Sequence, residues 1–289
     1  MRSGKYKNFL IFMFPTVLIL FLVLISPLIY SFVISFFNTS LKVRGIGNFV
    51  GLGNYISSLK DQYFTSSSLT TIKFTVIVVI IEFLVGLAIA LLLNTNIKGK
   101  NIFFSIIIIP MLITPIAVGL IWRLLLHSNL GIINYLLSLI GIRGKAWLAD
   151  PSLALGTVIF IDIWQQVPYM VLIILAGLTA LPNEPYESAA IDGSNRLQTF
   201  FLITLPLMMP TFMVIILLRS IMALKTYDLI YVLTRGGPGT TTEVISYHIY
   251  QQAFRYTQIG KASAMSYLLL LFIVPIAFLF VRLSKNKMK

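Results

Sequence analysis

Long apolar runs separated by short polar stretches dominate the chain. Runs such as Val76–Ile81 do not alternate apolar and polar residues as the strands of a membrane barrel do. A helix satisfies its own backbone polar groups within hydrocarbon and needs about 20 largely apolar residues to span it. The pattern therefore predicts an all-α integral membrane protein, a single transmembrane domain over 1–289 whose six spans lie at about 9–37, 72–93, 102–126, 153–180, 200–224 and 263–283.

Composition and charge support this interpretation. Of the 289 residues, 58% are hydrophobic and 11% are charged, so lipid must be part of the solvent. Arg2, Lys5 and Lys7 fit the basic region of a secretory signal, but the apolar run continues to Phe37 without a small-residue cleavage pattern, which favours an uncleaved span. Basic residues are densest at the two ends, so both termini and the loop at 183–206 are expected on the cytoplasmic side. The net charge of +13 is scattered and predicts no nucleic-acid binding.

The loop at 183–206 carries its own helix signals. Asn183 is expected to cap a first helix, and acidic Glu184 and Glu187 suit the positive end of its dipole. Gly193 ends this helix in the position where a left-handed residue is usual. Ser194 or Asn195 then caps a second helix, whose apolar face is expected to pack back on the bundle through Leu197, Phe200, Phe201 and Leu205.

Several polar side chains fall inside the predicted spans: Glu82, Arg123, Asp162, Gln165, Gln166 and Arg219. Such groups are costly facing lipid, so they line a solute path or pair with one another. Arg123 lies close to the end of its span and is expected to reach the interface. For Gln165, Gln166 and Arg219 we favour a solute path, because two adjacent helices present polar groups near mid-depth. Prolines at 110, 115, 168, 206 and 210 predict kinked or broken helices.

The sequence offers little for catalysis. It lacks a phosphate-binding loop of the G-x-x-x-x-G-K-[ST] type, has no cysteine, and has two histidines without metal-like spacing. A membrane-bound enzyme is therefore disfavoured, and we expect this chain to bind no cofactor or metal. A transporter driven by an ion gradient stays open as an alternative. It would not need a short cytoplasmic helix with small side chains, such as Ser188, Ala189 and Ala190 give the first helix of the loop.

The polar loop resembles the signature loop of binding-protein-dependent ABC importer permeases, E-A-A-x-x-D-G followed after a gap by I-T-L-P. Glu187, Ala189, Asp192, Gly193 and Ile203–Pro206 match it, and Ser188 replaces the first alanine. Runs elsewhere resemble the sugar-importing branch of maltose and glycerol-phosphate type: FVGLGNY at 49–55, DIWQQVPYM at 162–170 and YDLIYVLTRGGPG at 227–239.

This resemblance implies a type I ABC importer permease fold in a bacterial inner membrane. The implied partners are a second homologous permease subunit, two cytoplasmic ATPase subunits that hold ATP and Mg, and an extracytoplasmic solute-binding protein. Coupling to the ATPases would fall on Glu187, Ser188, Ala189, Asp192 and Gly193. The solute path would include Gln165, Gln166, Tyr169, Arg219, Ala223 and Thr226.

The nature of the solute stays open at this point. Tyr169 can stack on a sugar face, and glutamines can bond hydroxyls as donor and as acceptor. Ala223 and Thr226 differ from the amides of the maltose system, so the resemblance does not carry over specificity for maltose itself. Arg219 would suit an acidic sugar or a phosphorylated polyol, or it could be structural. We favour a neutral oligosaccharide over an anionic solute.

Overall fold

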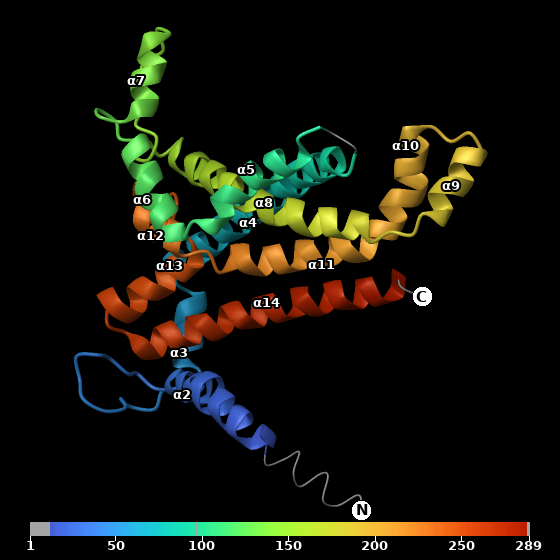
Figure 1. Cartoon of the computed structure of the whole chain (residues 1–289). Coiled ribbons are helices and arrows are strands. Elements are labelled where there is room, and N and C mark those ends of the chain that lie inside the picture. Colours follow the sequence, from blue (N-terminus) through green and yellow to red (C-terminus); the bar gives the residue numbers. More distant parts are fainter. Residues whose placement is uncertain (1–11, 96–97, 288–289) are drawn as a thin grey trace, which may run out of the picture. The chain divides into compact units, whose positions relative to one another are not determined.

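The computed structural model describes residues 12–95 and 98–287. These residues form helices joined by turns, with one isolated antiparallel bridge between Phe37 and Phe49 (Figure 1). Contacts divide the chain into two compact units, one made of residues up to 65 with 248–271, the other of 66–247 with the residues from 272 onward.

Four segments are long and apolar enough to cross a membrane: Phe12–Ile34, α4 (Gln62–Leu93), α8 (Ala154–Thr179) and Arg196–Leu233. The last consists of α10 (Arg196–Thr199), the π-helical turn η2 (Phe200–Thr204), α11 (Leu205–Leu224) and α12 (Asp228–Leu233). A fifth span is reached if α5 (Lys100–Leu112) and α6 (Pro115–Leu125), which are bent by 95°, count as one. With that pair counted as one span, the five spans correspond to five of the six predicted runs.

The sixth run, 263–283, falls in α14 (Ile259–Lys287), whose apolar part over the described residues is the shorter Ile259–Pro275. Residues 9–11 of the first run lie outside the described residues. Six spans therefore stay a prediction. The predicted break is confirmed at Pro115, because proline lacks an N–H and disfavours a helical residue before it. By contrast, α8 and α11 continue through Pro168 and Pro210.

The first unit contains η1 (Phe21–Ile25), α2 (Ser26–Ile34), α3 (Gly53–Leu59), η3 (Gln251–Arg255) and the first half of α14. Tyr267 Oη donates to Leu28 O at 2.6 Å, and Lys261 Nζ lies 2.7 Å from Asp61 Oδ2. Burial alone would raise the pKa of Asp61, but the lysine and local backbone amides outweigh it and hold that pKa below its usual value. These contacts tie α14 to α2 and to the turn before α4.

The second unit is built around α4, α8 and α11. Its buried core includes Ala90, Met170, Ile174, Met208 and Ile215. Glycines let these helices approach closely, as small residues do in membrane bundles: a Cβ on Gly86 of α4 would lie 2.6 Å from Met170 Cβ. The remaining short helices are α7 (Ile132–Leu139), α9 (Glu184–Ile191) and α13 (Ile245–Tyr250), which runs into the first unit.

Candidate functional site

The polar loop forms two short helices at the shared end of α8 and α11, as Figure 1 shows. Glu184 and Glu187 occupy the first turn of α9, as predicted. Asn183 occupies the N-cap position, as predicted, but its side chain makes no capping bond, and its backbone is already helical. Gly193 ends α9 with a φ of +72°, as predicted. The second cap is Asn195, which exchanges bonds of 2.9 and 2.8 Å with Gln198 in a capping box.

Most of the predicted coupling residues lie on the free surface of this loop. Glu187, Ser188, Asp192 and Gly193 are exposed, whereas Ala189 is buried. An exposed helix with an acidic first turn and small side chains is suited to close contact with another protein. The loop therefore has the surface that a docking helix requires.

The apolar face of α10 does not pack back on the bundle as predicted. Leu197 is 71% exposed and Phe201 58% exposed, while Leu205 packs against the buried core of α8 and α11. The cause is η2, because a π-helical turn adds a residue and rotates the positions before it relative to those after it. Residues of α10 and α11 therefore no longer share one face.

A hydrogen bond ties α9 to the start of α11. Tyr186 Oη donates to Thr204 Oγ1 at 3.1 Å. Both side chains line a cavity of about 470 Å³ together with Asn94, Thr179 and Asn183. Residues at the ends of α4 and α8 and the first turn of α9 line this polar cavity. The Tyr186–Thr204 bond joins the loop to the residue that precedes α11.

A buried ion cluster joins the three central helices of the second unit. Arg219 on α11 directs Nε to Glu82 Oε2 at 2.6 Å and Nη2 to Glu82 Oε1 at 2.9 Å. The same Nη2 also contacts Asp162 Oδ2 on α8. Glu82 on α4 is fully buried, and Arg219 and Asp162 are 2% and 5% exposed. Such bidentate pairing satisfies a guanidinium that would otherwise be very costly in hydrocarbon.

This cluster bears on the prediction that Arg219 contacts solute. Its guanidinium is already engaged by two carboxylates, which supports the structural alternative. Sequence reasoning identified all three residues as intramembrane polar groups but did not pair them. They lie 137 and 57 positions apart in the chain, and hydropathy carries no signal for which spans are neighbours.

The other predicted path residues have mixed surroundings. Gln165 Nε2 donates to the carbonyl of Ile113 at 2.9 Å, in the break between α5 and α6. It thereby satisfies a backbone group near Pro115, where the helix is interrupted. Tyr169 packs against the buried core, and Gln166 is half-buried on α8.

At the end of α11, Ala223 is buried and Thr226 is half-buried. Arg123 is exposed, and its Nη1 donates to the carbonyl of Val232 on α12 at 3.3 Å. Over residues 12–95 and 98–287, no three His, Asp or Glu side chains gather in a group that could hold a metal ion.

Comparisons with known proteins agree with the resemblance. The sequence model of the family "binding-protein-dependent transport system inner membrane component" matches residues 82–288. The trehalose/maltose transport system permease protein MalF of Thermococcus litoralis is 35% identical over 100% of this chain and 96% of its own length. The sulfoquinovosyl glycerol transport system permease protein SmoG of Agrobacterium fabrum is 31% identical over 94% of this chain and 89% of its own.

The fold also matches a solved structure. One chain of a bacterial ABC transporter involved in the import of the acidic polysaccharide alginate superposes with a TM-score of 0.86 at 22% identity, covering 100% of both chains. The expected all-α permease fold is thereby confirmed.

Proposed function

Because the chain belongs to the family of binding-protein-dependent transport system inner membrane components, we propose that it is one of two permease subunits of an ATP-driven sugar importer. In this proposal the chain is one transmembrane domain with six spans and cytoplasmic termini. A second homologous permease completes the pathway, two ATPase subunits hold ATP and Mg, and an extracytoplasmic solute-binding protein delivers the solute. The observation that carries the proposal is the exposed helix α9 at the shared end of α8 and α11.

In this mechanism the chain converts movement of the ATPases into movement of its membrane helices. α9 would be seated in a groove of one ATPase through Glu187, Ser188, Asp192 and Gly193. The hydrogen bond from Tyr186 to Thr204 transmits the displacement to the start of α11. The covalent connections of the loop also transmit it to α8 and α11. Small shifts at such a contact become large ones because packed elements have discrete arrangements.

The proposed solute is a sugar, supported by the names of the two relatives, and we favour a neutral oligosaccharide. The carboxylates of Glu82 and Asp162 already occupy the guanidinium of Arg219. A further anion there would have to displace one of them. Gln166 and Tyr169 on α8 are the candidates for contact with hydroxyls and sugar faces.

The test uses the reconstituted complex with its ATPases and solute-binding protein. Glu187→Lys or Gly193→Asp is expected to leave insertion intact and remove solute-stimulated ATPase activity. Glu184→Lys is the matched control, because it makes the same charge change on the same exposed turn outside the matched motif. Unchanged stimulation in Glu187→Lys would refute the coupling role. Uptake that stops with an uncoupler at constant ATP would indicate an ion-gradient-driven transporter instead.

A further inference from the structure

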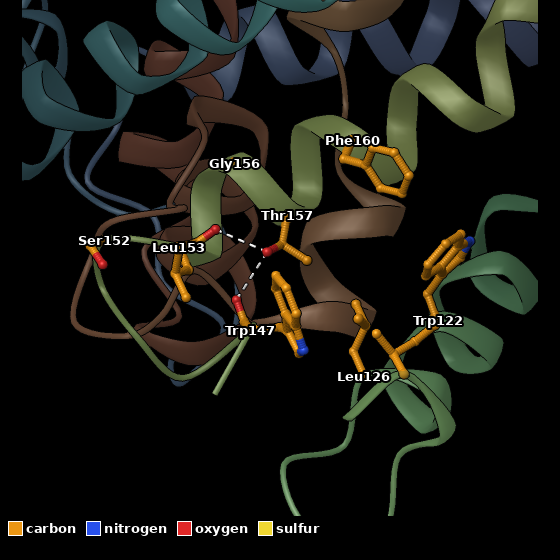
Figure 2. Close-up of a pocket in the computed structure, with 9 residues that line it drawn as sticks. Trp122, Leu126, Trp147, Ser152, Leu153, Gly156, Thr157 and Phe160 are labelled. Atoms are coloured by element: carbon orange, nitrogen blue, oxygen red, sulfur yellow. Dashed lines mark hydrogen bonds between the residues drawn. The ribbon is translucent and has the colours of Figure 1, made fainter. Parts of the chain in front are cut away.

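A second cavity, of about 500 Å³, lies where α6 ends and α8 begins. Figure 2 shows the ring of Trp147 on one side of it and Trp122 with Phe160 on the other. The rings of Trp122 and Phe160 meet edge to face with centroids 5.7 Å apart. Its volume falls within the range of ligand pockets, about 300–1,000 Å³. The walls are mainly aromatic and aliphatic.

The polar side chains in these walls form hydrogen bonds with other groups of the chain. Trp147 Nε1 donates to Asn134 Oδ1 of α7 at 2.8 Å. The hydroxyl of Thr157 bonds the carbonyls of Trp147 and Leu153 at 3.1 and 3.0 Å, as the dashed lines in Figure 2 mark. Ser152 Oγ donates to Asp150 Oδ1 at 2.6 Å. The cavity therefore presents carbon surface, which suits a hydrocarbon better than a sugar with many hydroxyls.

The position of the cavity and its neighbouring charges point to one class of occupant. The ends of membrane helices lie at the boundary between hydrocarbon and headgroups, where tryptophan is enriched. Arg143 and Lys145 are exposed in the segment that leads to Trp147, and Lys145 Nζ lies 5.8 Å from the centroid of the Trp147 ring. Hydrogen bonds from Ser152 hold the pKa of Asp150 below its usual range, so one carboxylate offsets one of these two cations. Residues 143–150, which include the cavity residue Trp147, therefore carry one net positive charge.

We propose that this cavity binds one acyl chain of an anionic phospholipid, with the headgroup phosphate beside Lys145. The proposal does not depend on the transported solute or on coupling to ATPases. It makes the cavity a lipid site that holds the α6–α8 end of the permease to its membrane. One net basic charge near a membrane surface is expected to enrich anionic over zwitterionic lipid about fivefold.

The chain supplies its own reporter for this site. It has three tryptophans; Trp122 and Trp147 line the cavity, and the Trp164 ring lies 5.5 Å from that of Trp122. The purified full chain would be placed in nanodiscs of phosphatidylcholine that contain a small fraction of phosphatidylglycerol or phosphatidylcholine with brominated acyl chains. Bromine quenches tryptophan on contact. Because Trp164 is itself 38% exposed, occupancy of this cavity is measured as the difference in quenching between variants.

Gly156 allows the cavity to be filled without disturbing the helix. A Cβ at Gly156, which lines the cavity, would meet nothing within 4 Å. Gly156→Leu would fill the space, and leucine has a higher helix propensity than glycine. Gly156→Ala is the matched control, because it adds only one methyl group. In the wild type and in Gly156→Ala, brominated phosphatidylglycerol should quench tryptophan fluorescence more effectively than brominated phosphatidylcholine. Equal quenching should need about one fifth of the mole fraction.

Two variants separate the acyl chain from the headgroup. Gly156→Leu should lose quenching relative to Gly156→Ala with either lipid, and Lys145→Gln should make the two lipids equivalent while quenching persists. Equal quenching in Gly156→Leu and Gly156→Ala would show that lipid touches only the outside of the helices. That result would overturn the proposal and leave an apolar side chain of a partner subunit as the occupant. A preference for phosphatidylglycerol that persists in Lys145→Gln would overturn the headgroup assignment.

Discussion

Replacing Arg219 with methionine is expected to destabilise the chain more than replacing its partner Asp162 with asparagine. With both carboxylates ionised, the cluster of Glu82, Asp162 and Arg219 carries a formal charge of −1. Arg219→Met leaves two carboxylates in a site where no side chain is more than 7% exposed. Asp162→Asn instead leaves the neutral pair of Arg219 and Glu82 with its bonds of 2.6 and 2.9 Å. The two substitutions therefore have opposite effects on the charge balance.

The magnitudes follow from the burial of the cluster. Removing one partner from a buried ion pair costs about 3–5 kcal/mol, because the remaining charge is left uncompensated. For a chain of this size, about 2–4 °C of melting temperature corresponds to 1 kcal/mol, so Arg219→Met should lower it by about 6–20 °C. Asp162→Asn loses one charged hydrogen bond, worth about 1.5–3 kcal/mol, and part of this is offset by relief of like-charge repulsion.

Thermal unfolding of the purified chain in detergent, followed by size exclusion after heating, measures this ranking. The triple variant Glu82→Gln, Asp162→Asn, Arg219→Met should be more stable than Arg219→Met alone, since it removes the uncompensated charges. In transport assays, Arg219→Met should reduce uptake of neutral and acidic solutes alike. A triple variant no more stable than the single one would refute the electrostatic reasoning. Normal stability with selective loss of acidic-solute uptake would show that Arg219 serves the solute.

Three further predictions concern smaller contacts. Tyr186→Phe removes the 3.1 Å bond to Thr204 but keeps the ring, so it should lower solute transported per ATP without preventing assembly; an unchanged ratio would exclude a role in coupling. Gln165→Leu leaves the carbonyl of Ile113 unpaired in the α5–α6 break and should cost about 1–3 kcal/mol in thermal unfolding. In the folded state the pKa of Asp61 is lowered from its ordinary value of 3.8. The ion pair of Asp61 with α14 therefore stabilises the fold at pH values above 3.8, and this stabilisation is lost as the pH falls through the folded-state pKa. Asp61→Asn should remove this acid-dependent loss, as acid unfolding curves would show.

Local chemistry made the polar loop largely predictable from the sequence. Gly193 needs no partner to adopt a positive φ, and Asn195 with Gln198 forms a capping box within four residues. The π-helical turn over Phe200–Thr204 has no comparable local signal, which is why the apolar face of α10 was assigned wrongly. The proline rule located the break at Pro115 but not its 95° bend, and it gave no sign that Gln165, 52 positions from Ile113, bonds the carbonyl in that break.

The sequence did not predict which polar residues of different spans pair with one another. In the sequence, each member of the cluster is simply a polar residue in an apolar run: Glu82, Asp162 and Arg219. Any of them could have faced a solute path. Their partnership requires that α4, α8 and α11 be neighbours at one depth. That arrangement follows from close packing at positions such as Gly86 and Met170, which hydrophobic periodicity does not encode.

The ion cluster also constrains how movement of the loop can reach the membrane helices. Asp162 lies about 25 Å along α8 from its end at Thr179, and Arg219 about 21 Å along α11 from its start at Leu205, at 1.5 Å per residue. The two helices adjoin the loop at one end and are held together by the cluster toward the other. Sliding α8 past α11 by one residue would pull Asp162 away from Arg219 and leave buried charges unpaired, at a cost of several kcal/mol. If α9 couples to an ATPase as proposed, we expect its displacement to move α4, α8 and α11 together, because the cluster makes relative sliding the costlier response.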